Sequence, residues 1–177
     1  VVPGSEKVAK EAKKEFLTGK VGVGTGCTVG KLLGKGFSME GGLGFSSHTF
    51  SDGTIVSALV AVNALGSIVN PENGQIIAGP KRDGKIFDSL DLLVNGKPQK
   101  RGFQNTTIGT IMTNAKISKV DCKRLAVAAN DGLAMSVRPS HTSNDGDLFF
   151  AFSNSQIDTK LSICLLYTSD AADEYSG

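Results

Sequence analysis

An asparagine–threonine peptide bond, Asn105-Thr106, stands where a polar stretch gives way to a β-branched, apolar one at residues 107–113. Cutting that bond would leave Thr106 with a hydroxyl nucleophile and a free α-amine that can take up the hydroxyl proton. An α-amino group titrates at about pH 8, so much of it is neutral at physiological pH, whereas a lysine amine would need strong desolvation to act as a base. The junction is therefore a candidate self-cleavage site of a hydrolase with an N-terminal threonine nucleophile.

The same three residues, Asn105-Thr106-Thr107, fit two other interpretations. They match the acceptor sequence for N-glycosylation, which has a meaning only in a secreted chain and often arises by chance. They are also an ordinary strand start, because asparagine favours turns and the following residues alternate as in a β-strand. Taken alone, the segment favours the ordinary strand start.

Two carboxylates, Asp145 and Asp147, are two residues apart. In a strand their side chains would emerge on the same face, where together they could hold an amine or alter each other's pKa. The ordinary alternative is a solvated turn, because the run Asn144-Asp145-Gly146-Asp147 has the composition of a turn. On its own the spacing favours the turn.

A glycine-rich run at residues 21–32 predicts close approach of the backbone around Lys31 and not a nucleotide site. In a phosphate-binding loop that ended at Lys31, Thr25 would occupy the first glycine position and Leu32 the position of the magnesium-binding hydroxyl. The dinucleotide pattern fails as well, because Cys27 occupies its third glycine position. No cofactor is expected, and by default Lys31 is a surface lysine.

Three further polar side chains have ordinary interpretations. Asn63 ends an apolar segment, where a turn or capping role is usual. His48 and His141 could act as catalytic bases, but neither sits in a recognisable nucleophile motif. Both histidines are therefore interpreted as structural.

Length, charge and cysteine content narrow the class of protein. At 177 residues the chain can form one domain with a buried core, and its net charge of +2 predicts no nucleic-acid partner. No apolar run has membrane-spanning length and no signal peptide is visible, although the chain opens at Val1 without an initiator methionine, so a signal could have been lost. Cys27, Cys122 and Cys164 are odd in number and far apart, which supports neither disulfides nor zinc and indicates a reducing, cytoplasmic setting.

Hydrophobic periodicity and turn residues predict a mixture of helices and strands. One helix is expected over residues 5–18 and another over 118–137, the second opened by a serine cap and stopped by Pro139. A turn is expected at 70–74, and an exposed loop with one apolar turn over 80–104. The expected strands cover residues 41–47, 54–62, 75–79, 106–113 and 148–152.

Several of these segments occur in the order found in one enzyme family. They are residues 24–32, 41–44, 58–64, 105–109 and 130–134, and His141-Thr142 with Asp145-Gly146-Asp147. On these motifs the chain resembles the L-aminopeptidase/D-esterase family of self-processed N-terminal-nucleophile hydrolases, which includes β-peptidyl aminopeptidases and the endo-type nylon-oligomer hydrolase. The resemblance runs from about Lys20 to Phe152.

The resemblance implies an α+β fold, an αββα sandwich of the type shared with ornithine acetyltransferases, in which two sheets pack between helical layers. It implies no cofactor and no metal, and a homo-oligomer of processed heterodimers. Matched position by position, the implied site consists of Thr106 as nucleophile, Asn105 before the cut, Asn63 as oxyanion-hole donor, Lys31 as the cation near the nucleophile, and Asp145 and Asp147 as the acidic pair near the new amine.

The activity implied by the resemblance is hydrolysis of N-terminal amide, peptide or ester bonds of small substrates. Threonine at position 106 resembles the nylon-oligomer branch, whereas the best-known aminopeptidases of the family have serine there. Cleavage of ω-amino-acid oligomers is therefore the alternative among enzymes. A non-catalytic sandwich used in oligomeric assembly is the alternative outside them, and it would leave the Asn105-Thr106 bond uncut.

Two features depart from the family pattern. Family members have a substantial segment before the glycine run, so residues 1–160 are expected to be a partial hydrolase domain, incomplete at the N-terminus and inactive alone. Self-cleavage would divide it into residues 1–105 and 106–160. Residues 164–174 match the translation of a common sequencing adapter, and 161–177 are therefore expected to be a non-native tail.

Overall fold

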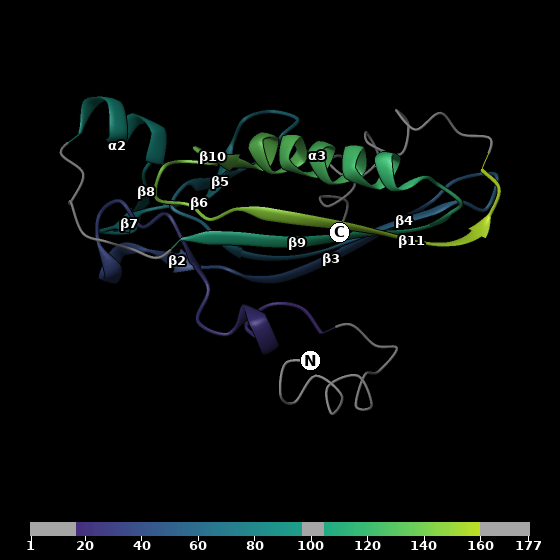
Figure 1. The fold of residues 1–177 in the computed structure, drawn as a ribbon. Helices are drawn as coiled ribbons and strands as arrows, with labels where there is room; N and C mark the ends of the chain where they lie inside the picture. The colour runs from purple at the N-terminus through teal and green to yellow at the C-terminus, as the bar shows by residue number, and fades with distance from the viewer. Residues whose placement is uncertain (1–16, 97–104, 160–177) are drawn as a thin grey trace.

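A computed structural model describes residues 17–96 and 105–159 of the chain (Figure 1). Its centre is a four-stranded mixed sheet with the strand order β11-β9-β4-β3. The four strands are β3 (Gly42–Thr49), β4 (Ile55–Asn63), β9 (Thr106–Ala115) and β11 (Leu148–Ile157). Strand β4 pairs antiparallel with both β3 and β9, and β11 runs parallel to β9. The four long strands expected from the sequence are therefore confirmed.

Strand β9 shows why these segments form a sheet. Thr107, Ile111 and Thr113 are buried, whereas the intervening Ile108 is exposed. A period of two places alternate side chains on opposite faces, so one face of the strand enters the core. The strand continues to Ala115, beyond its expected end, and β11 likewise outruns its expected end.

The long helix α3 (Lys119–Ser136) covers one face of the central sheet (Figure 1). It opens as the sequence predicts, because the Ser118 hydroxyl accepts a hydrogen bond from the N–H of Asp121 at 3.1 Å. Its buried side chains recur at four-residue intervals and belong to the same core as Ile111: Leu125, Ala129 and Leu133. This apolar stripe of the helix therefore packs against the central sheet.

A second, three-stranded sheet has the order β10-β5-β6. Its strands are β5 (Ser67–Val69), β6 (Ile76–Ala78) and β10 (Val137–Arg138). The helix expected to run through Val137 ends one residue earlier, at Ser136, because Val137 belongs to β10 and pairs with β5. The expected turn between β5 and β6 is confirmed, with the Gly74 N–H donating to the Asn70 carbonyl at 2.8 Å.

The segment expected to be an exposed loop, residues 80–104, is more ordered than the sequence predicts. It contains β7 (Lys81–Arg82), β8 (Lys85–Ile86) and α2 (Ser89–Asn95). Asp88 caps α2 by accepting the N–H of the second helical residue at 2.8 Å. The buried hydroxyls of Ser89 and Ser67 lie 2.9 Å apart, which ties α2 to the second sheet. Residues 97–104 lie outside the described residues.

The glycine-rich run places Lys31 beside the end of β4. The run contains η1 (Gly22–Gly24) and β1 (Thr28–Val29), and the short elements η2 (Lys35–Phe37) and β2 (Met39–Glu40) follow it. Gly30 has a φ of +68°, and a Cβ atom there would lie 2.2 Å from the carbonyl carbon of Gly79, so only glycine fits. The next N–H, that of Lys31, donates to the Leu65 carbonyl at 3.1 Å. The close backbone approach expected around Lys31 is confirmed.

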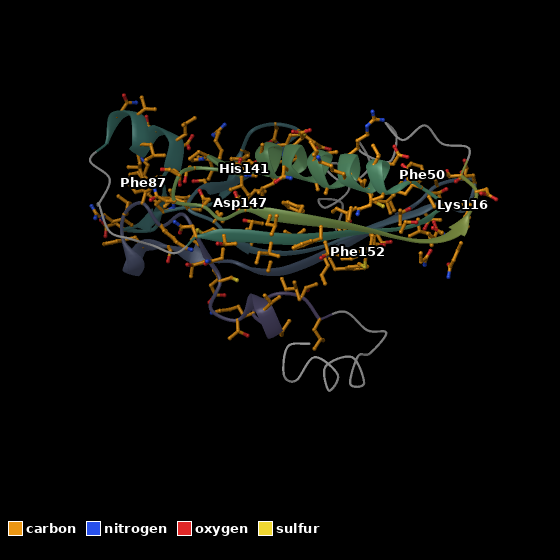
Figure 2. All side chains as sticks on the ribbon, viewed as in Figure 1. Phe50, Phe87, Lys116, His141, Asp147 and Phe152 are labelled. Atoms are coloured by element: carbon orange, nitrogen blue, oxygen red, sulfur yellow. The ribbon has the colours of Figure 1, made fainter. Side chains whose placement is uncertain are left out.

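The face of the central sheet away from α3 is apolar and exposed in the described part of the chain. Its exposed side chains on β9 and β11 include Ile108, Leu148, Phe150 and Phe152. Figure 2 shows Phe152 on the side of the sheet opposite α3. The predicted α+β class is confirmed, while the helix expected at 5–18 and the tail expected at 161–177 fall mainly or wholly outside the described residues.

Candidate active site

Thr106 is the first residue of β9, directly after the peptide bond predicted to be cut. Its Oγ1 donates a hydrogen bond to the carbonyl oxygen of Asn105. Asn105 is buried, and its side-chain Nδ2 donates to the Asn144 carbonyl at 3.2 Å. The N–H of Gly146 donates to the same Asn105 carbonyl oxygen at 2.9 Å. The predicted nucleophile and the carbonyl group that it would attack are therefore in direct contact.

Asn63 lies directly opposite Thr106, because the two residues are partners in the β4–β9 ladder. The side-chain Oδ1 of Asn63 accepts two hydrogen bonds, from the Thr28 N–H at 3.1 Å and from the Lys31 Nζ at 2.6 Å. These donors fix which end of the amide is oxygen. The NH₂ end, which is the donor end, consequently lies on the side away from the Lys31 ammonium.

Lys31 is a buried lysine and not a surface one, with 5 % of its surface exposed. Its Nζ also donates to the backbone carbonyl of Asn63 at 3.0 Å, so this amine contacts both the side chain and the backbone of Asn63. Burial disfavours the charged ammonium and lowers the pKa of Lys31, against the opposing attraction of Asp145 and, less strongly, of Cys27. The sequence pattern gave no sign of this burial.

Asp145 and Asp147 lie in the loop before β11 and not within a strand, so the argument from strand alternation does not apply to them. The Asp145 carboxylate accepts hydrogen bonds from the Leu65 N–H at 3.3 Å and the Thr142 N–H at 3.2 Å. Asp145 also forms an isolated parallel bridge with Asn105. This carboxylate therefore holds its own loop against the segment that follows β4.

Asp147 contacts the start of β9 and the backbone at His141. Its side chain, 3 % exposed, accepts hydrogen bonds from the Thr107 N–H at 2.7 Å and the His141 N–H at 3.0 Å. The His141 Nδ1 is a further 3.2 Å contact of the same carboxylate, and Figure 2 shows the two side chains together. Neither aspartate is a solvated turn residue, since each carboxylate binds backbone N–H groups of other segments.

His141, interpreted from the sequence as structural, is a neighbour of the site. Its φ is +52°, an uncommon conformation for a side-chain-bearing residue, and its contacts with Asp147 hold it there. His48 lies elsewhere on β3 and packs edge-on against Phe50, with ring centroids 4.7 Å apart. The sequence signal for both His141 and Gly146 was their place in the shared motifs, His141-Thr142 with Asp145-Gly146-Asp147.

The predicted site residues come from four separate segments and meet around the start of β9. Lys31 follows the glycine run, Asn63 ends β4, Thr106 begins β9, and the two aspartates precede β11. Within residues 17–96 and 105–159, no three His, Cys, Asp or Glu side chains are placed to hold a metal ion. No helix in this part of the chain is long and apolar enough to cross a membrane.

The sequence matches the family model described as Peptidase family S58 over residues 3–174. The chain belongs to peptidase family S58. An S58 relative from Mycobacterium leprae (strain TN), an uncharacterized aminopeptidase, is 36 % identical over 149 residues, which are 79 % of this chain and 38 % of the relative. A 6-aminohexanoate-oligomer endohydrolase of Paenarthrobacter ureafaciens is 29 % identical over 150 residues, covering 81 % of this chain and 41 % of the relative. The chain thus spans about two fifths of the length of these relatives.

Solved structures share the S58 fold. The L-aminopeptidase D-Ala-esterase/amidase of Ochrobactrum anthropi, a variant of the Ntn hydrolase fold, aligns with a TM-score of 0.53 at 20 % identity, covering 85 % of this chain and 38 % of that one. A β-aminopeptidase from a Burkholderia species aligns with a TM-score of 0.53 at 21 % identity, covering 88 % of this chain and 43 % of that one. The predicted family and its Ntn hydrolase fold are both confirmed.

Proposed function

We propose that the protein cuts itself between Asn105 and Thr106 and that the freed Thr106 is the nucleophile of an aminopeptidase or amidase. The observation that carries this proposal is the hydrogen bond from the Thr106 hydroxyl to the Asn105 carbonyl, at the strand end where Asn63 is its ladder partner. Membership of a peptidase family supports a hydrolytic use of this contact.

Self-cleavage follows from ordinary acyl chemistry. The Thr106 Oγ1 bonds to the Asn105 carbonyl carbon, the C–N bond breaks, and the hydroxyl proton passes to the Thr106 nitrogen, which gives an ester and a free amine. Water then attacks the same carbon, and Oγ1 leaves with a proton. The products are the Asn105 carboxylate and a Thr106 that carries both hydroxyl and amine.

In turnover, the Thr106 amine takes the hydroxyl proton while Oγ1 attacks the carbonyl carbon of a substrate. That proton then passes to the leaving amine or alcohol as its bond to the carbonyl carbon breaks, and water hydrolyses the remaining Thr106 ester to release the acid and restore the hydroxyl. The NH₂ end of the Asn63 amide donates to the developing oxyanion, a contribution of about 3 kcal/mol for one such donor. Lys31 supports this role because its Nζ, 2.6 Å from the Asn63 Oδ1, holds the amide in one orientation. Asp147 fixes the backbone next to the nucleophile through the Thr107 N–H.

The proposed substrates are small peptides, amides or esters with a free N-terminus. The aminopeptidase relative at 36 % identity favours this class. A second candidate is an ω-amino-acid oligomer, favoured by the relative described as a 6-aminohexanoate-oligomer endohydrolase, at 29 % identity. Comparing hydrolysis of amino-acid p-nitroanilides with that of 6-aminohexanoate oligomers separates the two.

Replacing Thr106 by alanine in the full-length protein should abolish both self-cleavage and hydrolysis, because no hydroxyl remains to attack either carbonyl. Thr106→Ser keeps the hydroxyl and the amine and should retain both activities. Thr110→Ala is a matched control, since Thr110 lies on the same strand and the same face but outside the site. Electrophoresis and p-nitroanilide hydrolysis measure the outcome, and cleavage of the same bond in Thr106→Ala would contradict the proposal.

A further inference from the structure

The carbonyl oxygen of Asn105 accepts hydrogen bonds from two groups on different segments. Besides the Thr106 hydroxyl, the backbone N–H of Gly146 donates to the carbonyl oxygen at 2.9 Å. Attack by Oγ1 turns this carbonyl oxygen into an oxyanion, so a donor already in place on it gains strength as the negative charge develops. Effective oxyanion donors lie about 2.7–3.1 Å from that oxygen, and the Gly146 N–H is within this range.

Carboxylates fix the backbone on each side of Gly146. On one side Asp145 accepts the N–H groups of Leu65 and Thr142, at 3.3 and 3.2 Å. On the other side Asp147, with a side chain 3 % exposed, accepts the N–H of Thr107 at 2.7 Å. A donor held in this way needs no reorganisation when the charge forms.

The absence of a side chain at Gly146 leaves room for the Thr106 hydroxyl beside the Asn105 carbonyl. A Cβ atom there would lie 3.0 Å from the Thr106 Oγ1 and 3.8 Å from the Asn105 carbonyl oxygen. The first distance is shorter than ordinary van der Waals contact, so a side chain would press on the nucleophile. Glycine lets the N–H and the hydroxyl approach the same carbonyl together.

We infer that the Gly146 N–H is the oxyanion donor of self-cleavage, and that Asp145 and Asp147 act in that step as positioning residues that hold it. The inference rests on the proposed function, because it needs Thr106 Oγ1 to attack the Asn105 carbonyl. In the tetrahedral state the carbonyl oxygen carries the charge and the Gly146 N–H donates to it. As the C–N bond breaks, the oxygen becomes the carbonyl of the ester. The competing explanation is that this N–H only extends the parallel pairing of β9 with β11, through the bridge of Asn105 with Asp145.

The test replaces the Gly146 N–H by oxygen and leaves every side chain in place. Glycolic acid, introduced at position 146 by suppression of a stop codon during cell-free translation of the full-length protein, turns the amide into an ester. Self-cleavage, followed by a labelled pulse and electrophoresis, should slow by roughly a hundredfold, as for other single oxyanion donors. Gly74 is the matched control, because its N–H also donates to a backbone carbonyl, that of Asn70 at 2.8 Å, in a turn between β5 and β6. Glycolic acid at position 74 should leave the cleavage rate unchanged.

The outcomes separate this inference from the proposed function. Unchanged cleavage with glycolic acid at position 146 overturns the inference, and so does a protein that no longer folds, because the N–H would then be structural. Thermal unfolding of both ester proteins in the Thr106→Ala background checks folding without cleavage. If Thr106→Ala itself still cleaves, the proposed function fails; if it does not, and the ester protein cleaves normally, only the role of Gly146 fails.

Discussion

At the scale of single residues, the site depends on which way the Asn63 amide faces. Two donors, the Thr28 N–H and the Lys31 Nζ, both bind the amide oxygen, so the amide nitrogen lies on the other side. A freely rotating amide would offer an oxygen to an oxyanion as often as an N–H, and an oxygen repels it. The orientation of the side chain therefore matters as much as its presence.

Replacing Asn63 by alanine should lower the rate of substrate hydrolysis by roughly a hundredfold or more, because one oxyanion donor is lost. Hydrolysis by the full-length, processed protein is the measurement, with the unfolding midpoint as a check on folding. Asn114→Ala is the control: Asn114 lies at the far end of β9 and its Oδ1 accepts the Ile55 N–H. An unchanged hydrolysis rate in Asn63→Ala would remove Asn63 from the site.

Lys31 should make stability depend on pH. Below its lowered pKa, the folded and unfolded chains both carry the proton, and the cost of burying the charge is fully present. Between that pKa and the ordinary value of about 10, the unfolded chain holds a proton that the folded chain has lost, so the free energy of unfolding rises with pH.

In the Lys31→Met protein this rise should be missing. The unfolding free energy of the parent minus that of the variant should therefore increase as pH rises through that window. Urea unfolding at several pH values, on the uncleaved Thr106→Ala background, measures it. The exposed Lys116, replaced in the same way, is the control. Parallel curves of unfolding free energy against pH for the parent and Lys31→Met would show that burial does not lower the pKa of this amine.

From the sequence, the junction made Thr106 only a candidate, and its role, like those of Asn63 and Lys31, was implied by the family resemblance. Sequence reasoning did not find Gly146 or His141 as parts of the site. Their positions depend on contacts across the chain, such as the one from Gly146 to Asn105, and no local spacing encodes such a contact. The burial of Lys31 was missed for the same reason.

Among the elements, the parallel pairing of β9 with β11 brings the loop that carries Asp145 and Asp147 to Thr106. Gly109 and Phe149 are partners in this ladder. A Cβ atom at Gly109 would lie 2.1 Å from the Phe149 ring, so the ring occupies the space that a side chain on β9 would need. The register of the two strands therefore depends on a glycine three residues beyond Thr106, the proposed nucleophile.

Gly109→Ala should destabilise the protein by about 1–3 kcal/mol, because the added methyl group forces the Phe149 ring out of its packing. Urea unfolding measures this cost, and the rate of self-cleavage reports whether the loop has shifted. Gly44→Ala is a matched control on β3, since a Cβ there meets only the Val60 carbonyl oxygen, at 3.9 Å. Equal costs for the two variants would show that the Phe149 contact does not fix the pairing.

Alternation was sufficient to predict β3, β4 and β9, and the Ser118 cap predicted where α3 begins. It could not predict β5 and β10, because their two or three residues are too few to show a period and β10 forms by pairing with β5, far away in the sequence. Helix α2 was missed as a helix because its support comes from the hydroxyl contact of Ser89 with Ser67.

At the scale of the whole molecule, the central sheet is covered by α3 on one face and exposes apolar side chains on the other in the described part of the chain (Figure 1). The two aromatic residues Phe150 and Phe152 are 47 % and 56 % exposed there. A contiguous apolar face of this kind is a surface that associates. The family resemblance predicted a second sheet against it, whereas chain length alone predicted only one domain with a buried core.

Because of this apolar face, the 177-residue chain made alone should associate and bind an apolar dye. It should also show little self-cleavage and no measurable amidase activity, because displacement of catalytic groups by about 1 Å can cost a hundredfold in rate. Replacing Phe150 and Phe152 by serine should reduce association. Replacing the exposed Val127 and Met135 of α3 should not, since they lie on the helix and not on the sheet face. A monodisperse, self-cleaved and active monomer would contradict this expectation.

Self-cleavage between Asn105 and Thr106 is tested most directly by the intact mass of the purified full-length protein. Self-cleavage predicts two chains, the second beginning at Thr106, whose masses together exceed that of the uncut chain by one water. One intact chain, or a cut at any other bond, would contradict the assignment of Thr106 as an N-terminal nucleophile.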